Sequence, residues 1–204
     1  RFPEELMINV LFIAFEFPPL NRGGVHRSLA FVKYLPQFGI KPLVITLAED
    51  SFERTFDIYS VDKELGKSVI DSSVIFPVST TLPVNKNKVQ QFRSIYFSIH
   101  GNDTEYWEEN FFTTTEKIIS EYDIKAIFAT VPPFSVLPLA LKLSEQHKIP
   151  LIYDFRDAWS QWRMSPYGCI FHYWTTLQFE NKYLSKANAV IATSLQTITD
   201  FKQT

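Results

Sequence analysis

Two acidic side chains, a guanidinium and an indole follow a short apolar run: Asp154, Arg156, Asp157 and Trp159 come directly after residues 151–153. Side chains at the carboxyl end of a parallel strand lie where such sheets bind ligands. Asp157 can accept hydrogen bonds from sugar hydroxyls, and Trp159 can offer an apolar ring face. Arg156 has two interpretations, since it either pairs with an acid as internal scaffolding or contacts a ligand.

A second candidate site is the glycine pair Gly23 and Gly24, which precedes a helical apolar pattern beginning at Val25. Without a Cβ atom, the backbone amides at a helix start can approach an anion closely. Arg22 and Arg27 flank the pair, and their guanidinium groups either neutralise a phosphate or are simply solvated. A tight turn between a strand and a helix is the alternative explanation for the pair.

Other chemistries are disfavoured by spacing. The loop FPPLNRGGVHR at 17–27 has neither the G-x-G-x-x-G spacing of dinucleotide sites nor the Lys and Ser or Thr of a phosphate-binding Walker loop. Asp154 and Asp157 are separated by two residues, which is not the D-x-D arrangement that holds a divalent ion. With one cysteine and four scattered histidines, no zinc cluster can be assembled. We therefore expect neither a cofactor nor a metal.

The elements that position these loops follow from short apolar runs. Buried strands are predicted at 8–15, 42–47, 74–78, 126–129, 151–153 and 189–193. Helical patterns separate them at 25–39, 107–122 and 136–147, with Gly39 in the place of a C-cap glycine. Residues 49–110 fit this alternation least and are interpreted as insertions and loops around the strand at 74–78. The pattern predicts an α/β fold, Rossmann-like and doubly wound, with a mainly parallel sheet and helices on both faces.

Ser194 ends the last predicted strand. Its hydroxyl either caps the helix that follows or points into the ligand cleft, and capping is the safer assignment.

Composition limits the partners. The 204 residues are 46% apolar and 21% charged with a formal charge of −2, which is ordinary for a globular domain. No basic stripe is present, so nucleic acid is not expected as a partner. The sequence shows no run of roughly 20 apolar residues and no secretion signal, which favours a cytoplasmic location. An aromatic run follows residue 161, and it fits helix packing, an acceptor pocket or peripheral contact with the inner face of a membrane.

Taken in order, four segments resemble the amino-terminal domain of glycosyltransferase family four, a retaining group with the GT-B fold. They are FPPLNRGGVHR at 17–27, ATVPPFSVLPLALKL at 129–143, IPLIYDFRDAW at 149–159 and ANAVIATS at 187–194. Enzymes of this type have two Rossmann-like domains across a cleft, the first for the acceptor and the second for the nucleotide sugar. The resemblance implies that residues 7–204 are the first domain, residues 1–6 a tag or extension, and the donor-binding domain absent from this chain.

The resemblance also implies roles for the candidate residues. Gly23, Gly24 and Arg27 would border the donor phosphates and the acceptor. Arg156 and Asp157 would be the catalytic candidates in the loop that lines the cleft, where many relatives have a histidine. The remaining binding candidates are Asp154, Trp159 and Ser194.

The expected function is that of the acceptor-binding half of a retaining glycosyltransferase, as in polysaccharide biosynthesis. It would transfer a sugar from a nucleotide sugar to a glycan or lipid-linked acceptor, and this piece alone would be inactive. No catalytic metal is implied, because helix N-termini and basic side chains offset the charge of the leaving diphosphate. The alternatives are a nucleotide-cofactor oxidoreductase domain, which the missing third glycine disfavours, and a non-catalytic glycan-binding domain.

Overall fold

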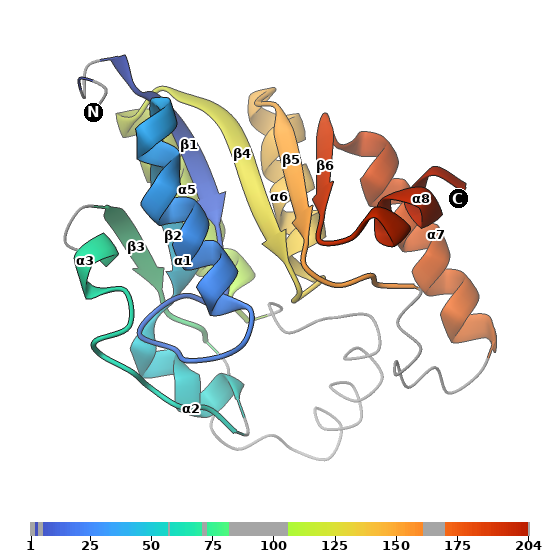
Figure 1. Ribbon diagram of the computed structural model, residues 1–204, viewed down its shortest axis with the longest axis horizontal. Helices are drawn as coiled ribbons and strands as arrows, with labels where there is room; N and C mark the ends of the chain where they lie inside the picture. The colour runs from blue at the N-terminus through green and yellow to red at the C-terminus, as the bar shows by residue number, and fades with distance from the viewer. Residues whose placement is uncertain are drawn as a thin grey trace.

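A single parallel sheet organises the domain (Figure 1). The computed structural model describes residues 3, 6–56, 58–70, 73–81, 106–160 and 170–203. The strands are β1 (Ile8–Ile13), β2 (Ile40–Leu47), β3 (Val74–Val78), β4 (Ile124–Val131), β5 (Leu151–Phe155) and β6 (Ala189–Ala192). They lie in the order β3-β2-β1-β4-β5-β6, and every neighbouring pair is parallel. The predicted Rossmann-like, doubly wound fold is confirmed.

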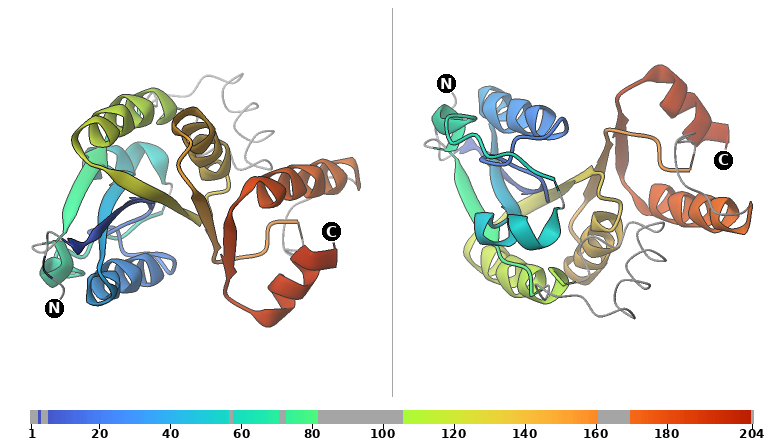
Figure 2. Two further views of the ribbon diagram at one scale, coloured as in Figure 1. Left: turned by 90° about the horizontal axis from the view of Figure 1, so that it is seen from above. Right: turned by 90° about the horizontal axis from the view of Figure 1, so that it is seen from below.

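Helices cover both faces of the sheet. The main ones are α1 (Val25–Tyr34), α5 (Glu108–Glu121), α6 (Val136–His147), α7 (Ile170–Lys186) and α8 (Leu195–Gln203). Shorter turns are η2 (Leu35–Phe38), η3 (Glu49–Ser51), α2 (Phe52–Thr55) and α3 (Lys67–Ile70). Figure 2 shows α1 on one side of the sheet and α5 and α6 on the other, with α7 on the same side as α6. No helix in the described ranges has both the length and the apolar character needed to cross a bilayer.

The apolar run from Val10 to Ile13 in β1 exists because both faces of the strand are buried there. Leu11 and Ile13 belong to the core cluster that includes α5 and α6 side chains. Val10 and Phe12 point into a second cluster that includes Val32 of α1. A strand covered on both sides must be apolar at every position rather than at alternate ones.

Most predicted elements lie where the sequence placed them. The helix at 136–147 and the strand at 74–78 have the predicted bounds. The first helix ends at Tyr34, and Pro36 is the second residue of the 3-10 turn that follows. Gly39 closes that turn with a left-handed φ of 74°. Of residues 49–110, which were interpreted as loops, 57, 71–72 and 82–105 lie outside the described ranges. The described part contains η3, α2, α3 and β3, and α5 already begins at Glu108.

The strand order fixes where loops converge. The chain runs outward from β1 through β2 to β3 and then returns to β4 on the other side of β1. Loops leaving β1 and β4 therefore diverge to opposite sides and leave a crevice at the carboxyl edge, the lower edge in Figure 1.

Candidate functional site

A pocket of about 450 Å³ opens at this point, between the carboxyl ends of β1 and β4. Its lining residues are Phe15, Glu16, Arg22, Thr55, Phe56, Ile58, Pro132 and Pro133. Glu16 and Arg22 place opposite charges in it, and the rings of Phe56 and the two prolines supply apolar surface. The pocket lies where doubly wound folds bind their ligands.

Glu16 lies between two guanidinium groups. Its Oε1 is 3.4 Å from Nη1 of Arg22, and its Oε2 is 3.7 Å from Nη1 of Arg156. The Arg22 side chain is 41% exposed and packs its guanidinium 4.7 Å from the centroid of the Phe56 ring, whereas the Arg156 side chain is 7% exposed. Arg22 is therefore the cation that a ligand in the pocket can reach.

Glu16 was not among the site residues predicted from the sequence. A signal was present, because Glu16 follows the first strand run as closely as Asp154 follows the run at 151–153. In this loop the predicted ligand contacts were instead the glycine pair, Gly23 and Gly24.

Arg156 joins the ends of several strands. Its Nε donates to the Val131 carbonyl at 3.3 Å, its Nη2 donates to the Pro132 carbonyl, and its own carbonyl accepts a hydrogen bond from Thr193 Oγ1 at 2.9 Å. Burial lowers the pKa of Arg156, and the nearby Glu16 carboxylate opposes that shift. These contacts fit the scaffolding interpretation of Arg156. Its role as a catalytic residue stays a prediction.

The backbone of Gly24 lies close to the guanidinium of Arg156. A Cβ atom at position 24 would lie 1.3 Å from Nη1 and 2.4 Å from Cζ of Arg156, and the backbone of Gly24 is right-handed helical with φ −72°. A Cβ at position 24 would therefore force the buried guanidinium to move, so glycine here serves close approach and not an unusual backbone conformation. A Cβ at Gly23 would meet nothing within 4 Å. Contact of either glycine with a phosphate stays a prediction.

Arg27 and Asp154 pair with each other. Nε of Arg27 lies 3.1 Å and 3.0 Å from the two carboxylate oxygens, and Nη2 lies 2.6 Å from Oδ1. Thr130 Oγ1 donates to Oδ2 at 3.0 Å. The hydrogen bond to Asp154 raises the pKa of Arg27. Asp154 is fully buried, so its carboxylate presents no accessible atom in this arrangement, and both residues hold α1 against β4 and β5.

Trp159 is also enclosed. The side chain stacks on Phe134, with ring centroids 4.8 Å apart and planes 8° apart, and it lies near Tyr183 of α7. Its backbone amide and that of Ser160 donate to Oε1 of Glu180 at 3.1 Å and 3.2 Å. Glu180 is fully buried, and this burial raises the pKa of its carboxyl. The loop after β5 is thus fixed to α7 by one carboxylate.

The other two candidates face outward. Asp157 is exposed at the carboxyl edge. Ser194 Oγ accepts a hydrogen bond from the Thr197 amide at 3.1 Å, which is the capping role preferred from the sequence. In the described part of the chain, no three His, Cys, Asp or Glu side chains lie together in a way that could hold a metal ion.

Comparison with known proteins gives a structural match. No family model and no curated protein matches the sequence. Among solved structures, the chain is similar to sucrose-phosphate synthase from Thermosynechococcus elongatus, with a TM-score of 0.61 and 12% identity. The match covers 96% of this chain and 45% of the synthase chain, so this chain spans less than half of that protein's length. The likeness supports the expected GT-B-like fold, and membership of glycosyltransferase family four stays a prediction.

Proposed function

We propose that this chain is the acceptor-binding domain of a glycosyltransferase that uses a nucleotide-sugar donor. The observation that carries the proposal is the charged pocket at the β1–β4 crevice, in a fold shared with an enzyme named sucrose-phosphate synthase. In this proposal the acceptor is a glycan or a lipid-linked acceptor, and transfer retains the anomeric configuration, as in the family that the sequence resembles.

The pocket has the side chains that sugar recognition needs. Carboxylate oxygens of Glu16 accept hydrogen bonds from hydroxyl groups, and the exposed guanidinium of Arg22 donates to sugar or phosphate oxygens. The Phe56 ring provides an apolar face of the kind that packs on the C–H surface of a sugar ring. Arg156 holds Glu16 in place from the buried side and leaves Arg22 to contact the ligand.

The donor is bound chiefly by a second domain in this proposal. The matched synthase chain is more than twice as long as the aligned region, which leaves room in that protein for a second half. The N-terminus of α1, beginning after Gly24, contributes backbone amides toward the donor phosphates. Asp157 is an exposed acid at the same edge, and it remains a catalytic candidate from this chain together with Arg156.

Nucleotide binding tests this division of labour. UDP and GDP are titrated by calorimetry into the 204-residue chain and into a longer protein that joins it to a donor-binding domain. We expect weak or no binding to the chain alone and tight binding to the longer protein. Tight binding to the chain alone would contradict the assignment of the donor site.

Pocket substitutions test the acceptor site in the longer protein. We expect Glu16→Gln to raise the acceptor KM about tenfold, consistent with loss of a charged hydrogen-bond acceptor, with little change in the nucleotide Kd. Glu53→Gln is the matched control, because Glu53 is an exposed acid on α2 outside the pocket lining. An unchanged acceptor KM in Glu16→Gln would exclude the pocket as the acceptor site. Absence of sugar transfer with intact glycan binding would identify a non-catalytic binding domain instead.

A further inference from the structure

The start of α7 carries a group of exposed apolar side chains, which we name the α7 ring surface. Its members are Ile170 (85% exposed), Phe171 (61%) and Trp174 (55%). Phe171 and Ile170 lie three and four positions before Trp174, so the three side chains share one side of the helix. The buried residues of the same helix are Thr176, Glu180 and Tyr183, so the core has its own contacts with α7. Isolated exposed apolar residues are ordinary, but these three lie together within five positions and form a surface that favours a partner.

The surface lies at the ligand-binding edge of the domain. In Figure 1 the first turns of α7 extend at the lower right, past the carboxyl ends of the strands. The charged pocket opens along the same edge. A partner that covers the α7 ring surface therefore faces the edge where the site lies.

Along α7, the exposed surface changes from uncharged aromatic side chains at the start of the helix to a lysine further on. The segment Ile170 to Phe179 contains no acidic residue, and the first acid, Glu180, is fully buried. Phe171, Trp174, Gln178 and Lys182 follow at spacings of three, four and four, which places them on one stripe of the helix surface. The stripe passes from two aromatic rings through an amide to an ammonium group, over a length of about 17 Å.

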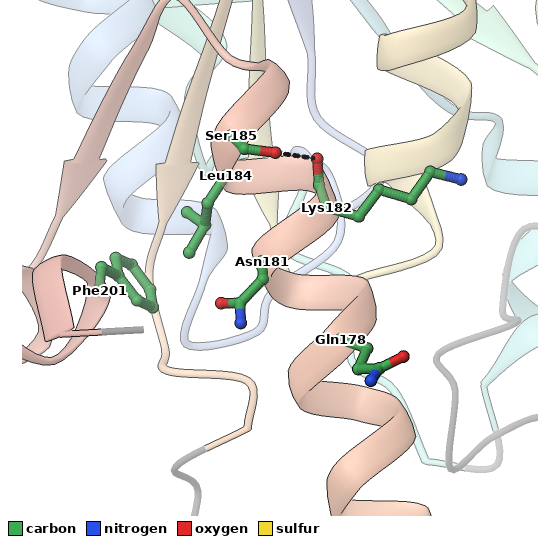
Figure 3. Close-up of a pocket in the computed structure, with 6 residues that line it drawn as sticks. All are labelled: Gln178, Asn181, Lys182, Leu184, Ser185 and Phe201. Atoms are coloured by element: carbon green, nitrogen blue, oxygen red, sulfur yellow. Dashed lines mark hydrogen bonds between the residues drawn. The ribbon is translucent and has the colours of Figure 1, made fainter.

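The ammonium end of the stripe borders an open polar groove between α7 and α8 (Figure 3). The groove of about 590 Å³ is lined by Gln178, Asn181, Lys182, Leu184, Ser185 and Phe201. Ser185 Oγ is bonded to the Lys182 carbonyl at 3.0 Å, and Figure 3 shows the Lys182 side chain extending away from Phe201. Lys182 is exposed, whereas Lys186 one turn later pairs with Glu145 at 3.3 Å.

We propose that the α7 ring surface docks on a bilayer that contains anionic phospholipid. Tryptophan, tyrosine and phenylalanine prefer the boundary between headgroups and acyl chains, and a nearby lysine adds attraction to lipid phosphates. The stripe has this composition, and the lack of accessible acids among its side chains removes the repulsion that an anionic surface would exert. The inference rests on the surface of α7 and not on the proposed sugar transfer.

Vesicle co-sedimentation of the 204-residue chain tests the proposal. The probes are vesicles of pure phosphatidylcholine and vesicles with about 30% phosphatidylglycerol, which carry a negative surface potential. We expect binding to the anionic vesicles, weakened about tenfold or more by the double change Phe171→Ser and Trp174→Ser. Lys182→Glu should weaken binding to anionic vesicles severalfold and leave binding to the neutral vesicles nearly unchanged.

Matched controls lie elsewhere on the chain. Phe38 is 73% exposed but ends η2 at the opposite edge of the sheet, so Phe38→Ser should leave vesicle binding unchanged. Lys117 is an exposed lysine on α5, and Lys117→Glu makes the same change in net charge as Lys182→Glu. The melting temperature of each variant confirms that it is folded.

Three results would overturn the proposal. The first is no sedimentation with anionic vesicles at millimolar lipid. The second is equal loss of binding in Phe38→Ser and in the double variant. The third is a dimer in sedimentation velocity that the double variant abolishes while vesicles remain unbound, which would assign the surface to a second copy of the chain.

Discussion

The Arg156 guanidinium fills the space beside Gly24 that a larger side chain at position 24 would need. The guanidinium lies where a Cβ of residue 24 would be, and it is held there by the carbonyls after β4 and by Glu16. A glycine in such a loop suggests close approach of a phosphate, yet here a side chain of the same protein already needs the space. The two explanations are separable by experiment.

We predict that Gly24→Ala lowers the free energy of unfolding by about 1–3 kcal/mol, the usual cost of overpacking. In an Arg156→Ala background the same change should be nearly neutral, because the added methyl group then has room. Urea unfolding of the four proteins in this double-mutant cycle gives the coupling energy. Gly23→Ala is the control, since a Cβ there meets nothing within 4 Å. Additive effects of the two changes would show that the contact does not require the glycine.

Glu180 gives a prediction about pH. Burial raises the pKa of its carboxyl above the ordinary 4.5, so the folded state binds this proton more tightly than the unfolded state. The stability that Glu180 contributes is therefore fully present below pH 4.5 and is lost as the pH rises through the folded pKa.

In Glu180→Gln that dependence should disappear, because an amide does not titrate. We expect the difference in unfolding free energy between the wild type and Glu180→Gln to shift in favour of the variant as the pH rises above about 4.5. Chemical unfolding at a series of pH values measures it. Glu121→Gln, an exposed acid on α5, serves as the control. Parallel pH profiles for the wild type and Glu180→Gln would contradict the assignment.

Among elements, α1 is tied to the sheet by the Arg27–Asp154 pair. Asp154 is buried on β5, Thr130 of β4 donates to it, and Arg27 reaches it from α1. Removing one partner leaves a buried carboxylate without its cation, which costs far more than the loss of a surface ion pair.

We expect Arg27→Met to lower the free energy of unfolding by about 3 kcal/mol, and Asp154→Asn in the same chain to recover part of this loss. Arg22→Met is the matched control, because Arg22 is 41% exposed and its pair with Glu16 should contribute less than about 1 kcal/mol. Thermal and urea unfolding measure both. Equal costs for the two arginine variants would show that the Arg27–Asp154 pair does not anchor the helix.

Elements with a strong local pattern were predictable from the sequence. The apolar runs specified the strands because those strands are buried on both faces, and the run at 136–147 specified α6 by its period. The helices α2 and α3 have four residues each, which is too short for a period to be visible. The rule that ligands bind at the carboxyl ends of parallel strands located the candidate residues, but it did not predict which other residues they contact.

The contacts of those residues depend on distant parts of the chain. Arg27 and Asp154 are 127 positions apart, and no local pattern links them. Trp159 was expected to offer its ring to a ligand, but its burial depends on Phe134 and Tyr183, which come from other elements. Residue types at strand ends therefore locate a site, whereas the division between scaffold and ligand contact requires the fold.

Across the whole molecule, packing weakens toward the edges of the sheet, since most residues of β3 and β6 are half-buried or exposed. β1 and β4 are central and mostly buried, whereas the residues of β6 are exposed or half-buried. Within the described ranges β6 pairs only with β5. Local opening takes less free energy where fewer apolar contacts are broken.

Hydrogen exchange followed by mass spectrometry should show this gradient in the 204-residue chain. We expect amides of β1 and β4 to exchange slowest and those of β6 and α8 to exchange much faster. The rates in β2, which is also covered on both faces, provide the internal reference. Protection of β6 equal to that of β1 would indicate that a further contact covers this edge.

The contacts of Arg156 also decide how the domain can be re-engineered. Its guanidinium meets the loops after β1 and β4, and its carbonyl meets the loop after β6, so these loops cannot be exchanged one at a time. A graft at 16–24 must retain Glu16 and Gly24 or remove Arg156 as well. Thr55, Phe56 and Ile58 line the same pocket from outside this network. They are the positions at which a library could alter acceptor preference while the strand ends stay connected.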